Sequence, residues 1–147
     1  MPGTDVDALI NQGIKAANSG DTVYALECLE QAVKLRSTPR AWSYLAFCLA
    51  RERQQIDYAV KICEEAIRKD PRSSSHYLNL GRIHLLAGRR TDAIRLFRQG
   101  LLYERNVQIE AELRRLGLRK PPVIGFLGRE HVLNKYLGIM LTKLRLR

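Results

Sequence analysis

Apolar residues recur along most of the chain at the spacing of helix faces, in stretches separated by turn and cap residues. The stretches fall near residues 5–18, 22–35, 39–52, 56–69, 74–87 and 91–104. Apolar steps of three and four residues place side chains on one face of an α-helix. Gly20 and Gly88 interrupt the first and third pairs of stretches, and Pro71 separates the second pair from the third. Thr38 offers an N-cap and Pro39 a proline at the first helical position. The pattern predicts three helical hairpins.

The hairpins repeat with a period of 34 residues. The positions that keep this spacing are Ala25, Ala59 and Ala93, then Ala32, Ala66 and Gly100, then Leu29, Cys63 and Phe97. Gly13, Ala46 and Gly81 recur at intervals of 33 and 35 residues. Small side chains let two helices of a hairpin approach closely. We therefore expect Gly81 to face Ala93, with the equivalent pairing in the other two hairpins.

This pattern resembles the tetratricopeptide repeat family, whose signature is W-x2-L-G-x2-Y, then A-x3-F, then P. The third copy reads Tyr77-x2-Leu80-Gly81-x2-His84 and then Ala93-x3-Phe97; the second reads Trp42-x2-Leu45-Ala46-x2-Leu49 and then Ala59-x3-Cys63. The first copy is degenerate. The resemblance covers about residues 6–106 and implies three repeats, at 6–38, 39–72 and 73–106. Each hairpin needs a neighbour to cover its apolar face, so we expect an all-α, right-handed α-solenoid.

The remainder of the chain predicts further elements. Residues 107–118 fit a helix that caps the last repeat, residues 119–129 an extended connection with two prolines, and residues 130–147 a basic amphipathic helix. The apolar face of this last helix is the predicted docking face of the tail: Val132, Leu133, Tyr136, Leu137, Met140, Leu141 and Leu144. The segments RKPPVIGFL and LNKYLG in this region resemble the ending of some small bacterial repeat proteins of unassigned role. That resemblance implies no activity.

Charge is concentrated at the same end. The 147 residues carry a net charge of +10, and residues 114–147 contain nine Lys and Arg against one acidic residue. The basic character is therefore a property of the tail. We expect the tail to fold back on the repeats or to pair with a second copy in a homo-oligomer, because burial stabilises its apolar face. A second protein and an anionic membrane surface are the next alternatives, and nucleic acid is the least expected, because aromatic residues to stack bases are missing.

Composition favours a globular chain in a reducing compartment. Hydrophobic residues make up 46% and charged residues 27% of the sequence, as in soluble domains. The three cysteines form no C-x-x-C pair, the first residues are acidic without an apolar segment, and no run of about 18 apolar residues occurs. We therefore expect a cytoplasmic location.

The sequence contains no recognisable catalytic or metal-binding motif. It lacks G-x-G-x-x-G, a Walker loop, G-x-S-x-G and H-E-x-x-H. His76, His84 and His131 have no partner at ligand spacing, and Cys63 takes the place of the family's phenylalanine, where it is best explained as a small core residue. We expect no enzymatic activity, no catalytic residues, no metal and no cofactor.

The family resemblance implies a binding groove lined by the first helix of each hairpin. Its predicted residues are Ile10, Ile14, Arg40, Phe47, Leu78, Arg82 and Leu85. Such a groove suits an amphipathic helix or an apolar strand, with the two arginines as anchors. The alternative is that these residues pack against the second helices or the tail. Relatives that clamp a terminal carboxylate use Lys, Asn and Arg where this chain has Ile10, Ile14, Tyr44, Ser75 and Asn79, so such clamping is not expected.

These observations predict a non-enzymatic protein–protein interaction module. It would act as an adaptor or scaffold that binds a peptide or helix of a protein partner of unknown identity in its concave groove. Two alternatives remain open. One is a dedicated chaperone for an exported apolar client, and the other is a peripheral membrane-associated adaptor attached through residues 130–147.

Overall fold

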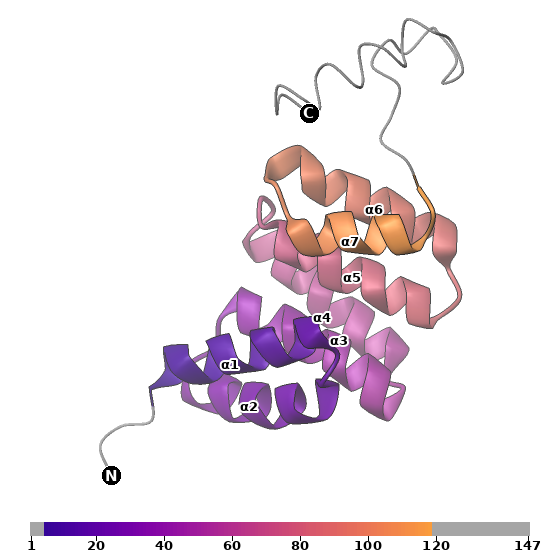
Figure 1. Cartoon of the computed structure of the whole chain (residues 1–147). Helices are drawn as coiled ribbons and strands as arrows, with labels where there is room; N and C mark the ends of the chain where they lie inside the picture. The colour runs from indigo at the N-terminus through magenta and orange to yellow at the C-terminus, as the bar shows by residue number, and fades with distance from the viewer. Residues whose placement is uncertain (1–4, 119–147) are drawn as a thin grey trace, which may run out of the picture. The chain divides into compact units, whose positions relative to one another are not determined.

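A computed structural model describes residues 5–118, which form α-helices joined by short loops, without a strand in that range (Figure 1). The helices are α1 (Val6–Ser19), α2 (Thr22–Leu35), α3 (Pro39–Arg53), α4 (Ile56–Lys69), α5 (Ser74–Leu86), α6 (Arg90–Tyr103) and α7 (Val107–Arg115). The chain divides between Leu113 and Arg114 into two units. The predicted connection at 119–129 and the tail helix at 130–147, with its docking face, lie outside the described residues.

Local sequence signals set the ends of the helices. The Asp5 carboxylate caps α1 by accepting hydrogen bonds from the backbone N–H groups of Asp7 and Ala8. Gly20 ends the same helix in the left-handed region, at φ 94°. The Thr38 hydroxyl caps α3, with Pro39 as the first helical residue. The six predicted helices are confirmed to within one residue at each end.

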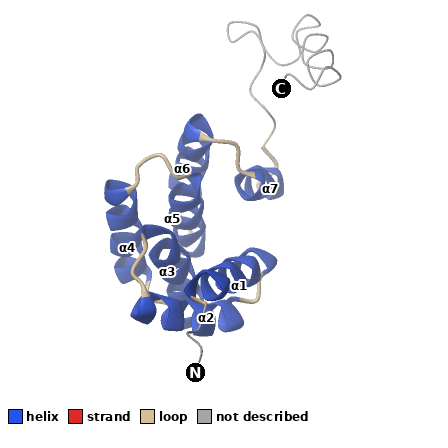
Figure 2. Ribbon diagram, turned by 90° about the vertical axis from the view of Figure 1, so that its left-hand side faces the viewer, coloured by secondary structure: helices blue, strands red, loops and turns tan. Residues whose placement is uncertain are grey.

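The helices pack as three successive hairpins, α1–α2, α3–α4 and α5–α6, each packed on the next. Their side chains form one core that includes the repeat positions Leu29, Ala59 and Cys63. Figure 2 shows α1 and α7 on one side of this array and α4 on the opposite side. The described chain is therefore an α-solenoid of helical hairpins, as predicted.

Two glycines of the first helices lie against large side chains of the second helices. A Cβ atom added to Gly81 would lie 2.3 Å from Cε1 of Phe97, and one added to Gly13 would lie 2.6 Å from Cγ of Leu29. The side chain nearest to Gly81 is therefore Phe97, one turn of α6 beyond the predicted Ala93. Each glycine leaves space for a large, fully buried side chain of the facing helix, because a small residue beside a large one keeps the packing dense.

The three cysteines, Cys28, Cys48 and Cys63, are free and buried. Burial raises the pKa of the Cys48 thiol to about 12, and it raises that of Cys63 as well. Because the thiolate is the nucleophilic form, these two side chains are inert at neutral pH. They act as small apolar core residues.

Candidate interaction surface

An arginine on α5 joins the first helices of the repeats. The Arg82 guanidinium donates a hydrogen bond to the Glu112 carboxylate of α7 at 3.2 Å and another to the Asn18 side chain of α1 at 2.8 Å. It also lies over the ring of Phe47 on α3, with 5.1 Å from Cζ to the ring centroid. Arg82 thus contacts α1, α3 and α7 from α5, and we call this set of contacts the Arg82 bridge.

The residues predicted to line the groove differ in accessibility. Five of them expose 7% of their surface or less: Ile10, Ile14, Phe47, Leu78 and Arg82. We call these five residues the inner face. Arg40 is exposed and Leu85 half-buried. In the described chain, the inner face is therefore a packed floor, and Arg40 and Leu85 are the accessible predicted residues.

A polar cluster lies beside the inner face, between α3 and α5. The Ser43 hydroxyl donates to the Arg40 carbonyl at 3.1 Å, accepts from the Asn79 amide at 3.2 Å, and lies 3.0 Å from His76 Nδ1. Ser43, His76 and Asn79 are fully buried. Because the Ser43 hydroxyl donates its proton to the Arg40 carbonyl, it can only accept a hydrogen bond from the His76 ring. This arrangement favours the tautomer with the proton on Nδ1 of His76. The cluster holds α3 and α5 in register.

The His76 ring gives the cluster a pH dependence. Burial lowers the pKa of His76 more than the nearby Asp70 carboxylate raises it. The unfolded chain takes up this proton near pH 6.5, whereas the folded chain takes it up only at lower pH. Stability therefore falls as the pH drops through about 6.5, by at most about 1.4 kcal/mol per pH unit for one proton.

Chemical denaturation of the wild type and of His76→Gln at pH 7.5 and pH 5.5 tests this expectation. The glutamine keeps a polar group beside Ser43 and does not titrate. We expect the wild type to lose more unfolding free energy than the variant between the two pH values. Equal losses would show that His76 is not the group responsible.

Helix α7 is held against the last hairpin by the residues that precede it. The Glu104 carboxylate accepts hydrogen bonds from the Ser74 backbone N–H at 2.8 Å and from its hydroxyl at 2.9 Å, and the first of these bonds lowers the pKa of Glu104. The Asn106 amide donates to the same hydroxyl and its carbonyl oxygen caps α7 through Ile109 N–H. Ile109 is fully buried. These bonds fix the start of α7, so that the Glu112 carboxylate can accept a hydrogen bond from the Arg82 guanidinium.

Sequence reasoning missed the partners of Arg82 and the polar cluster. Arg82 was predicted as an anchor for a ligand. The residues to which it donates, Asn18 and Glu112, are 64 and 30 residues away in sequence. One signal was present: an arginine in a column that is otherwise apolar needs a carboxylate or amide partner if it becomes buried. The sequence does not show which residue supplies it.

The residues that replace the family's carboxylate-clamping set carry no positive charge. Ile10, Ile14, Tyr44 and Asn79 are buried, and Ser75 is half-buried. Among residues 5–118, no group of three or more His, Cys, Asp or Glu side chains gathers in a way that could hold a metal ion. Over the same range no helix is long and apolar enough to cross a membrane.

Comparison with known proteins supports a fold built from helical repeats. Residues 44–106 match the model of a tetratricopeptide repeat family. No curated protein sequence matches the chain. The first tetratricopeptide repeat domain of human RPAP3 superimposes with a TM-score of 0.56, at 18% identity, over 76% of this chain and 89% of that one.

Two further solved structures share the fold. The first such domain of Spaghetti (RPAP3), bound to the HSP90 peptide SRMEEVD, gives a TM-score of 0.54 at 18% identity over 76% of this chain and 90% of that one. The Sgt2 domain from Aspergillus fumigatus gives 0.54 at 21% identity over 84% and 89% of the two chains. The family match covers most of the second hairpin and the whole of the third. The first hairpin packs on the second as the second packs on the third. Residues 44–106 therefore match the tetratricopeptide repeat family, and the described chain shares the fold of its domains.

Proposed function

We propose that this chain is a protein-interaction module that binds a peptide or a helix of a partner protein over its inner face and catalyses no reaction. The repeat fold, with α1, α3 and α5 as the first helices of its hairpins, is the observation that carries the proposal. A structural neighbour with the same fold is bound to a peptide. The fully buried thiols and the histidines with lowered pKa values offer no activated nucleophile.

The accessible residues around the inner face define what a partner would present. Arg40 is exposed at the first turn of α3, and Leu85 is half-buried in the last turn of α5. A partner would offer an acidic or amide group to Arg40 and an apolar side chain to Leu85. Tyr44 and Asn79 are buried and neutral, so the binding of a terminal carboxylate is not the proposed mode.

Matched surface variants test this proposal. Partners that co-purify with the tagged full chain are quantified for the wild type, Leu85→Asp and Arg40→Glu. The controls are Leu102→Asp and Arg98→Glu, which make the same changes at exposed positions of α6. We expect at least one partner to be lost with both Leu85→Asp and Arg40→Glu and retained with both controls. Retention of every partner by Leu85→Asp and Arg40→Glu would contradict binding at this face.

The two alternatives gain no argument from the described residues. A chaperone for an apolar client needs an accessible apolar surface, whereas Ile10, Ile14, Phe47 and Leu78 are packed. Attachment to a membrane would depend on residues 130–147, which lie outside the described range. The interaction module is therefore the function that the geometry supports best.

A further inference from the structure

A groove runs along α4, and Figure 2 shows α4 on the side of the array opposite α1 and α7. The groove has a volume of about 640 Å³, and we call it the α4 groove. Its apolar lining includes Pro39, Trp42, Ile62 and Ala66. The Trp42 ring is held in place by a hydrogen bond from its Nε1–H to the Ser37 hydroxyl at 2.8 Å. Tyr58, which is 54% exposed, forms part of the same wall.

The charged residues of this groove are mostly basic. Lys61, Arg68 and Lys69 line it together with a single acid, Glu65. Glu65 forms an ion pair with Arg68. Lys61 and Lys69 are exposed and form no ion pair with any residue that the structure describes. An apolar floor thus lies between two lysines whose charges are available to a ligand.

The length of the groove indicates the size of its ligand. Tyr58 and Lys69 both line it, and a helix that rises 1.5 Å per residue separates them by about 16 Å. An extended peptide rises about 3.3 Å per residue, so about five residues span this distance. Alternate side chains of such a peptide point the same way, toward the floor or away from it.

We propose that the α4 groove binds a short acidic peptide segment of a partner protein, in extended form, with one apolar side chain seated against Trp42 and carboxylates paired with Lys61 and Lys69. Charge complementarity selects this occupant. The basic residues 114–147 of the chain itself do not have the charge that the groove requires. The apolar lining by Pro39, Ile62 and Ala66 suits an apolar side chain, which a nucleic acid does not offer.

Trp42 provides a direct readout, because it is the single tryptophan of the chain. The probe is an acetylated and amidated pentapeptide with four glutamates around a central leucine, titrated into the full chain at low salt. We expect a saturable change in Trp42 emission, weaker binding in 0.5 M NaCl, and weaker binding of the pentapeptide with serine in place of leucine. An unchanged emission spectrum, or equal binding of a pentapeptide with lysines in place of glutamates, would overturn the proposal.

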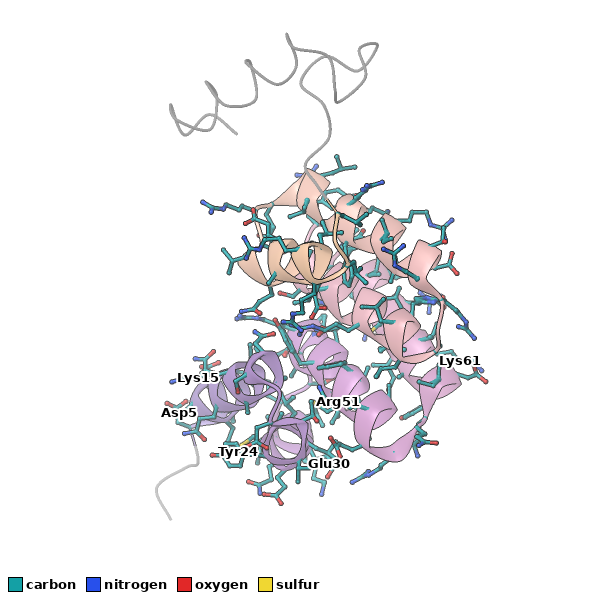
Figure 3. All side chains as sticks on the ribbon, turned by 45° about the vertical axis from the view of Figure 1, so that its right-hand side comes forward. Asp5, Lys15, Tyr24, Glu30, Arg51 and Lys61 are labelled. Atoms are coloured by element: carbon teal, nitrogen blue, oxygen red, sulfur yellow. The ribbon has the colours of Figure 1, made fainter. Side chains whose placement is uncertain are left out.

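Two charge reversals make the test specific to the groove. Lys61→Glu reverses a charge that lines the α4 groove, and Lys15→Glu makes the same change on α1; Figure 3 shows these two lysines at opposite sides of the molecule. We expect Lys61→Glu to weaken peptide binding at least about fivefold and Lys15→Glu to leave it within about twofold.

Equal weakening by both variants would show a non-specific charge effect and reject the site. Tighter binding of an oligothymidylate than of the peptide, lost in Lys61→Glu, would assign the groove to nucleic acid and overturn the proposal. Lys15 and Lys61 are both exposed, so neither change is expected to unfold the chain. The outcome is independent of Leu85 and Arg40, so it does not depend on binding at the inner face.

Discussion

Replacement of Arg82 by methionine is expected to lower the free energy of unfolding by about 3–5 kcal/mol, the cost typical of removing one partner from a buried ion pair. The variant loses the bonds to Glu112 and Asn18 and the contact with the Phe47 ring, while Glu112 remains 8% exposed. Because these contacts lie on three other helices, their loss affects the packing of the hairpins on one another.

Denaturant unfolding of three variants separates the charge from the packing. Arg82→Met should be the least stable, and Arg82→Lys intermediate, because lysine keeps the charge and loses the planar fork. The double variant Arg82→Met with Glu112→Leu should recover part of the loss, since it removes both charges together. Substitutions at ordinary surface positions change the free energy of unfolding by about 0.5 kcal/mol or less. A loss that small for Arg82→Met alone would show that the Arg82 bridge does not hold the hairpins together.

Replacement of Phe97 by alanine is expected to cost about 3–5 kcal/mol, as for other large aromatic side chains removed from a core. Phe97 is fully buried, and its ring occupies the space left by Gly81. The same geometry predicts that Gly81→Ala destabilises the chain by about 1–2 kcal/mol, because the strain of overpacking exceeds the gain in helix propensity. The two positions act as one packing unit.

A double-mutant cycle with Gly81→Ala and Phe97→Leu tests this coupling by thermal or chemical unfolding. Leucine lacks the ring atoms that an added Cβ would meet, so the combined loss should be smaller than the sum of the two single losses by about 0.5–2 kcal/mol. Additive losses would mean that the helices adjust without strain and that the contact between these two positions is not specific.

Most of the fold could be predicted because its signals are local. Thr38, Pro39 and Gly20 act through the hydrogen bonds and backbone angles of their own helix ends, so their roles are readable from a few neighbouring residues. The buried positions Leu29, Cys63 and Phe97 follow from the repeat period. The close contact of Gly81 with Phe97, one turn beyond Ala93, was not predicted, because periodicity gives the face of a helix and not the rise at which two helices meet.

The candidate surface was harder to predict, because it depends on contacts between distant residues. The repeat columns predict that Ile10, Phe47 and Leu78 share a face, but not how far neighbouring helices cover them. Glu112 reaches Arg82 only because Asn106 and Glu104 fix the start of α7 against the third hairpin. No local pattern in the sequence encodes that placement. The burial of the inner-face residues could therefore be learned only from the structure.

Amide hydrogen exchange of the full chain, with and without a partner obtained by the co-purification described above, tests the proposed function most directly. Binding at the inner face predicts slower exchange in the stretches of α1, α3 and α5 that surround Ile14, Phe47 and Leu85, because a bound segment covers these helices. Protection confined to α2 and α6, or to residues 119–147, would contradict it.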